Sequence, residues 1–166
     1  TFGYNKDHRP DLKQLLFILT VSEDGGVPLH FRAESGNVVD DQTHRDTWEL
    51  LCQLTGRRDF LYVADCKLAT SENMAFLHQR GGRFITVLPR TRGEDQAFRQ
   101  TLRQGQVTWR TVFEKTHEDD PKLILDRFSV AEAPTLSAEG YRLLWYHSTR
   151  KAESDAAARP HRPGAP

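Results

Sequence analysis

The sequence predicts a mixed α/β fold, in which an antiparallel hairpin and a parallel strand–helix–strand unit contribute to one sheet. Residues 15–21 and 27–34 are extended apolar runs on either side of an Asp-Gly-Gly turn, which is a hairpin signal. Residues 60–65 and 84–88 are two further apolar runs with a helical pattern between them. A crossover helix makes the strands that it joins parallel. We therefore expect both kinds of strand pairing.

The second strand of the hairpin has an alternating pattern. Val27, Leu29, Phe31 and Ala33 alternate with polar residues, which is typical of a strand with one apolar face. Pro28 stands near the start of this strand, and its missing backbone N–H suits an edge position.

An amphipathic helix should follow the hairpin and end at about Thr55. Asp40 or Asp41 would cap its amino end, and Gly56 would stop it. Its apolar face would consist of Trp48, Leu51 and Cys52.

The run at 60–65 predicts a buried strand whose last residue is Asp65. In open α/β sheets, side chains at the carboxyl ends of such strands leave the packed interior and face a crevice. Ligands bind in this crevice, so functional residues are often found there. Asp65 is therefore the first candidate for a functional residue. Ser71 would cap the following helix, and a Gly-Gly pair would end it before the strand at 84–88.

The second half of the chain predicts one helix and then three strands. The helix would cover residues 94–104, and the strands would cover 107–114, 123–130 and 140–147. A helix-forming run at 151–158 precedes a tail with three prolines in its last seven residues. We expect an α/β core at 1–92, a β-rich insertion at 93–150, and the start of a helix with a disordered tail at 151–166.

Composition narrows the function only loosely. The 166 residues include 23 Lys and Arg and 23 Asp and Glu, so no overall positive field favours nucleic acid, although a local basic groove is compatible with neutrality. Cys52 and Cys66 lack metal-ligand or redox spacing, which suits a reducing, intracellular setting. No apolar stretch approaches the roughly 20 residues that a membrane span needs, and we expect no signal peptide. We expect a cytoplasmic protein.

Four segments carry a family resemblance. They are Gly-Tyr-Asn-Lys-Asp-His-Arg-Pro-Asp-Leu-Lys-Gln at 3–14, Ser-Gly-Asn-Val-Val-Asp at 35–40, Val-Ala-Asp-Cys-Lys-Leu at 63–68 and Arg-Phe-Ile-Thr-Val-Leu-Pro-Arg at 83–90. In this order and spacing, they resemble the core of bacterial insertion-sequence transposases of the DDE superfamily. A weaker resemblance continues through residues 140–146 to about residue 158, so it covers nearly the whole chain.

The resemblance implies a ribonuclease-H-like mixed sheet and a metal-dependent reaction on DNA. In that fold, a three-stranded antiparallel meander is followed by helix, strand, helix and strand, and the first strand is missing here. Three carboxylates bind two Mg²⁺ or Mn²⁺ ions, which activate a water or a DNA 3′-hydroxyl for attack on a phosphodiester. Asp65 matches the second carboxylate and would be both catalytic and metal-binding. The first would precede Thr1 and the third would follow Ala158, so we expect a partial or inactive copy.

The implied partner is double-stranded DNA at insertion-sequence ends, in the bacterial cytoplasm near the nucleoid, and the intact family implies possible homo-oligomers. Basic side chains near strand ends, on one rim of a sheet, would contact DNA phosphates without reading the sequence. The candidates are Arg9, Lys13, Lys67, Arg83, Arg90 and Arg92.

Other interpretations remain open. Glu34 and Asp40 could join Asp65 in another ribonuclease-H-like metal nuclease, or the chain could be a non-catalytic DNA-binding remnant. Asp7 or Asp11 could replace the first carboxylate, although they precede the wrong strand. Trp48, Trp109 and Trp145 could stack on bases, but they are more simply core or sheet-face residues. His44 and His78 lack a partner at metal-ligand spacing and are most simply helix-face residues.

Overall fold

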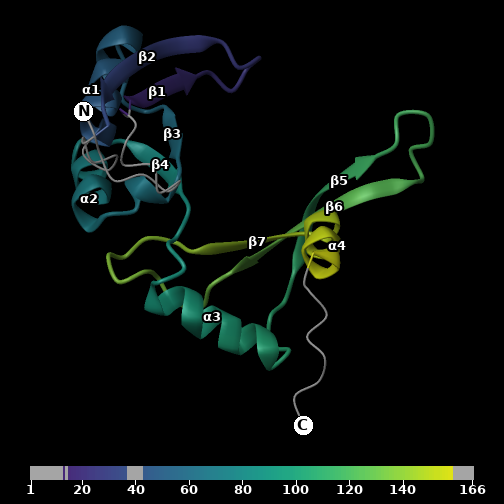
Figure 1. Ribbon diagram of the computed structural model, residues 1–166. Helices are drawn as coiled ribbons and strands as arrows, with labels where there is room; N and C mark the ends of the chain where they lie inside the picture. The colour runs from purple at the N-terminus through teal and green to yellow at the C-terminus, as the bar shows by residue number, and fades with distance from the viewer. Residues whose placement is uncertain (1–12, 14, 37–42, 159–166) are drawn as a thin grey trace. The chain divides into compact units, whose positions relative to one another are not determined.

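The computed structural model describes residues 13, 15–36 and 43–158. The chain divides into two compact units, Thr1–Pro89 (unit 1) and Arg90–Pro166 (unit 2). The described residues form a mixed α/β structure with one parallel strand pair, antiparallel sheets and four α-helices (Figure 1), which confirms the α/β class. None of the helices in the described part is long and apolar enough to cross a membrane.

Unit 1 contains the predicted succession of strands and helices. Its elements are β1 (Leu15–Val21), β2 (Pro28–Ser35), α1 (Thr43–Thr55), β3 (Leu61–Ala64), the 3₁₀ turn η2 (Cys66–Leu68), α2 (Ser71–Gln79) and β4 (Arg83–Thr86). β1 and β2 pair antiparallel, and β3 and β4 pair parallel, as predicted. The two pairs are separate two-stranded sheets rather than one mixed sheet, because no described strand lies between them to join their ladders.

The core of unit 1 lies between α1, α2 and the parallel pair. It consists of Trp48, Leu51, Tyr62, Leu68 and Leu77, all 8% exposed or less. The ring of Trp48 also meets that of Phe76 edge-on, with centroids 6.1 Å apart. The helical spacing of Trp48 and Leu51 therefore predicted the buried face of α1 correctly.

β3 and the hairpin bury less than the sequence predicts. In β3 only Tyr62 is fully buried, while Leu61 and Val63 on the other face are 50% and 65% exposed. One face of the hairpin also turns apolar side chains to solvent, with Phe17 57% and Phe31 68% exposed, while Leu16 and Ile18 of β1 are half-buried on the other face. The half-buried residues of β2 are the polar ones. One of them, Arg32, forms an ion pair with Asp46 of α1 over 3.5 Å.

The helix ends in unit 1 agree with the predictions except at one cap. Thr70, not Ser71, caps α2, and its hydroxyl accepts a hydrogen bond from the Asn73 backbone N–H over 3.1 Å. Gly56 follows α1 with φ +66°, a backbone conformation that side chains disfavour. The cap predicted at Asp40 or Asp41 lies outside the described residues.

Unit 2 is a three-stranded antiparallel sheet with two helices. Its elements are α3 (Gly93–Arg103), β5 (Arg110–Thr116), β6 (Ile124–Glu132), β7 (Leu144–Ser148) and α4 (Thr149–Ala157). Figure 1 shows β5 and β6 as a long hairpin, with β7 on the other side of β6. Phe98 of α3 packs edge-on against Trp109 and Trp145, with centroids 6.2 Å and 4.4 Å away. Both tryptophans therefore pack within unit 2.

Candidate functional site

Asp65 directly follows β3, at the carboxyl end of the parallel pair, as predicted. The neighbouring strand ends at Thr86, whose hydroxyl donates a hydrogen bond to the Asp65 backbone carbonyl over 2.5 Å. This bond joins the two strand ends at the edge where the sequence predicts a functional residue.

The Asp65 carboxylate is exposed and has a local structural role. Its Oδ1 accepts a hydrogen bond from the Lys67 backbone N–H over 2.9 Å, which caps η2. Burial of Tyr62, and after it the negative charge of Asp65, raise the pKa of the Tyr62 phenol to about 12. The Tyr62 hydroxyl lies 3.1 Å from Nδ1 of His44. The Tyr62 phenol is therefore protonated at neutral pH.

The described residues do not fit a two-metal centre. Magnesium prefers hard oxygen ligands and is usually held by more than one carboxylate or by substrate phosphates as well. In the part of the chain that the structure describes, no group of three or more His, Cys, Asp or Glu side chains could hold a metal ion. Glu34 is in an ion pair with Arg32 over 2.5 Å. The other carboxylates considered in the sequence, Asp7, Asp11 and Asp40, lie outside the described residues.

The basic candidates in unit 1 do not share one rim. Lys67 is exposed and lies two residues after Asp65, whereas Arg83 is the first residue of β4, at the opposite end of the strand pair. Strands of this length separate their ends by roughly 10 Å. Nε and Nη2 of Arg83 both donate to the Asp59 backbone carbonyl, Nε over 3.0 Å. Lys13 is exposed, and Arg9 lies outside the described residues.

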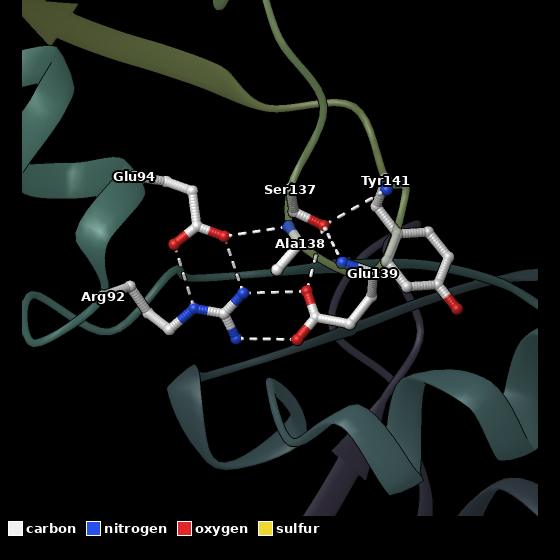
Figure 2. Close-up of polar contacts among 6 residues, drawn as sticks. All are labelled: Arg92, Glu94, Ser137, Ala138, Glu139 and Tyr141. Atoms are coloured by element: carbon white, nitrogen blue, oxygen red, sulfur yellow. Dashed lines mark hydrogen bonds and ion pairs between the residues drawn. The ribbon is translucent and has the colours of Figure 1, made fainter.

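In unit 2, Arg90 is exposed, whereas Arg92 is held between two carboxylates (Figure 2). Arg92 is the residue before α3, and its Nε and Nη2 donate to Glu94 over 3.2 Å and 2.7 Å. Its Nη1 and Nη2 donate to Glu139 over 2.9 Å and 2.8 Å. This double fork is strong and directional. We expected Arg92 to contact DNA phosphate, but here its guanidinium binds carboxylates of its own chain.

The Arg92 cluster extends into the loop before β7. Glu94 Oε1 accepts the Ala138 backbone N–H over 3.0 Å, and Glu139 Oε2 accepts the Ser137 hydroxyl over 3.0 Å. The hydrogen bond from Arg92, and after it the one from Ala138, lower the pKa of Glu94 to about 2. The hydrogen bonds to Glu139 and Glu94 raise the pKa of Arg92. The cluster therefore joins the start of α3 to a loop 47 residues away, and nothing in the sequence around Arg92 indicates that distant partner.

Asp126 is a second polar anchor that the sequence analysis did not single out. It is 7% exposed and accepts hydrogen bonds from the Ser148 hydroxyl over 2.8 Å, the Thr149 hydroxyl over 3.0 Å and the Arg150 backbone N–H over 3.1 Å. Burial would raise the pKa of Asp126, but the hydrogen bonds outweigh it and lower the pKa. The Ser-Thr pair before α4 is a helix-capping signal from which the helix start could have been predicted, although not its partner on β6.

Comparison with known proteins finds no match for this chain among protein-family models, curated proteins or solved structures. A function therefore has to be inferred from the residues of the chain itself.

Proposed function

We propose that this chain belongs to the DDE superfamily of insertion-sequence transposases and acts in DNA transposition, with Asp65 as one carboxylate of the catalytic set. The observation that carries the proposal is the position of Asp65, an exposed carboxylate at the carboxyl end of β3 in a parallel pair. In open α/β sheets, ligands bind at this edge of the sheet. The proposed setting is the bacterial cytoplasm, where such a protein reaches chromosomal DNA.

The arrangement of unit 1 supports a ribonuclease-H-like interpretation. In that fold a further strand precedes the hairpin and lies between it and the parallel pair. A sheet without this central strand would separate into an antiparallel pair and a parallel pair, and unit 1 contains these two pairs in the order β1, β2, α1, β3, α2, β4.

We propose fewer DNA contacts than the six basic residues that the sequence predicts. Lys67 is the described cation nearest in sequence to Asp65, and Lys13 and Arg90 are exposed. We exclude Arg92, because two carboxylates already occupy its guanidinium. Contacts of this kind bind phosphates without base recognition, and their affinity falls steeply with salt.

We expect the purified chain to bind duplex DNA but not to cleave or join it. One carboxylate holds Mg²⁺ weakly, and the described residues supply Asp65 alone at the strand end. The test is a gel assay of cleavage and strand joining with Mg²⁺ or Mn²⁺, together with duplex binding at several salt concentrations. Asp65→Asn is the matched variant, because the amide oxygen can still accept the Lys67 N–H.

The outcomes separate the proposal from its alternatives. Turnover that depends on Asp65 would refute the inactivity and show a complete nuclease. NMR line broadening by Mn²⁺ that centres on Asp65 and disappears in Asp65→Asn would support the metal-ligand role. DNA binding without such broadening would favour a non-catalytic DNA-binding protein, and absence of duplex binding would refute both.

A further inference from the structure

One face of the unit 2 sheet has three aromatic rings in a row across its strands. Phe113 of β5 lies opposite Phe128 of β6, and Tyr146 of β7 lies opposite Val130, the next residue of β6 on that face. The ring centroids of Phe113 and Phe128 are 5.7 Å apart with an interplanar angle of 29°. Those of Phe128 and Tyr146 are 5.6 Å apart at 27°. We call Phe113, Phe128 and Tyr146 the aromatic row.

The outer rings of the aromatic row face solvent. Phe113 is 59% and Tyr146 is 65% exposed, whereas the tryptophan next to Tyr146 in β7, on the opposite face, packs against α3. Cross-strand aromatic pairing stabilises a sheet, which accounts for the half-buried Phe128. It does not account for two largely exposed rings at the ends of the row, and clustered exposed apolar side chains mark binding surfaces.

Two cations lie on the same face, on either side of Phe113 along β5. The register places Arg110 opposite Val130 and Lys115 opposite Asp126, so both share the face of the aromatic row. Both side chains are exposed. Among the described residues, neither has a carboxylate within ion-pair distance. From farther away, the charge of Arg110 adds to the larger effect of the Arg142 hydrogen bond in lowering the pKa of Glu132. The Asp126 carboxylate is already occupied by donors at the start of α4.

Arg127, the other described Arg or Lys in the three strands, points to the opposite face and bonds Glu114 over 2.7 Å. Arg142, in the loop before β7, bonds Glu132 over 2.8 Å. On the face of the aromatic row, the unpaired positive charge of the strands therefore stands at the two ends of the β5 segment that carries Phe113. A ligand that matches this arrangement has flat apolar groups joined by anionic links.

We propose that the aromatic row binds single-stranded nucleic acid, with bases stacked on the rings and phosphates contacting Arg110 and Lys115. Bases that stack on aromatic side chains of a sheet, beside cations that follow the backbone, are a general means of single-strand binding. Neighbouring rings are 5.6–5.7 Å apart, more than the roughly 3.4 Å per nucleotide of a duplex strand. One base per ring therefore requires an extended, unpaired strand. This site is independent of Asp65 and goes beyond the proposed function.

The test is fluorescence anisotropy of the full chain with labelled oligothymidylate and oligouridylate of about 12 nucleotides, within the usual range of such sites, and with a duplex of the same length. We expect both single strands to bind more tightly than the duplex. Phe113→Leu and Tyr146→Leu should each weaken binding by about 5- to 150-fold, the usual effect of losing one stacked base. Leucine keeps an apolar side chain on the strand, and circular dichroism checks the fold. Tyr146→Phe keeps a ring and should keep the affinity.

Phe17 and Phe31 supply the matched control. Their rings are also exposed and stacked, 6.0 Å apart, but they lie in unit 1, on a hairpin face whose β1 and β2 residues are apolar except Ser35. Phe31→Leu should leave single-strand binding unchanged. Arg110→Gln combined with Lys115→Gln should make the salt dependence shallower by about 1.4 in the log–log slope, at about 0.7 per phosphate.

Three results would overturn the proposal. The first is no single-strand binding up to about 100 μM protein, the weak end of non-specific affinities. The second is binding that the leucine variants leave intact. The third is a dimer that the leucine variants dissociate without any effect on nucleic acid, which would assign the aromatic row to a second copy of the chain. Preference for thymidylate or for uridylate would identify the strand as DNA or RNA.

Discussion

At the scale of single residues, the strongest electrostatic arrangement described here is Arg92 between Glu94 and Glu139. The three side chains are 17–22% exposed, so water screens their attraction only in part. Two carboxylates share one guanidinium, and Glu94 also accepts the Ala138 amide. The loop at 137–139 is therefore held to the start of α3 by polar contacts rather than by an apolar core.

Glu94→Gln should destabilise the chain by about 1–3 kcal/mol at pH 7, the range for losing a hydrogen bond to a charged group. The pKa of Glu94 falls from 4.5 to about 2 on folding. Its stabilising contribution is therefore complete above about pH 4.5 and is lost as the pH falls towards 2. Thermal unfolding between pH 7 and pH 2 should show the difference between wild type and variant shrinking over that range. Glu118→Gln, in the exposed turn between β5 and β6, is the control and should change the stability at pH 7 by less than about 0.5 kcal/mol. A pH-independent difference for Glu94→Gln would contradict the ion-pair role.

At the scale of elements, the link between α2 and β4 depends on a glycine. A Cβ at Gly82 would lie 2.9 Å from Cζ2 of Trp48 and 3.0 Å from the Leu77 carbonyl oxygen. Trp48 is 1% exposed, so its ring has little space to move. The close approach of this link to α1 therefore requires a residue without a side chain.

Gly82→Ala should destabilise unit 1 by about 1–3 kcal/mol, as overpacking of a core usually does. Chemical denaturation followed by tryptophan fluorescence measures the loss. Gly93→Ala is the control, because a Cβ there meets no heavy atom within 4 Å, and it should change the stability by less than about 0.5 kcal/mol. Equal stability of Gly82→Ala and wild type would mean that Trp48 does not pack as described.

At the scale of the whole molecule, what the sequence predicts well is what depends on neighbours in the chain. The Asp-Gly-Gly turn predicted the β1–β2 hairpin, the spacing of Trp48 and Leu51 predicted the buried face of α1, and the crossover by α2 predicted the parallel pair. Each of these signals involves residues within about one element of each other. The position of Asp65 at a strand end was predicted for the same reason.

What depends on distant residues was not predicted. The alternation in β2 shows that one face is apolar, but not that this face is exposed. Which face is buried depends on the elements that pack against the hairpin, and Asp46 of α1 pairs with Arg32 on the other face. The partner of Arg92 is 47 residues away, and a charged residue before a helix has no local pattern that indicates a distant carboxylate. The division of unit 1 into two sheets likewise depends on which strands meet, which apolar runs do not specify.

The two-stranded sheets of unit 1 have a consequence for amide exchange. In a two-stranded sheet every strand is an edge, so each of β1 to β4 turns alternate backbone N–H groups away from its described partner. Hydrogen exchange followed by NMR should therefore show fast and slow amides alternating along β1 and β2. β6 has a partner on both sides and should be slow at consecutive positions. Slow exchange at consecutive residues of β1 would reveal a further strand paired with it in solution.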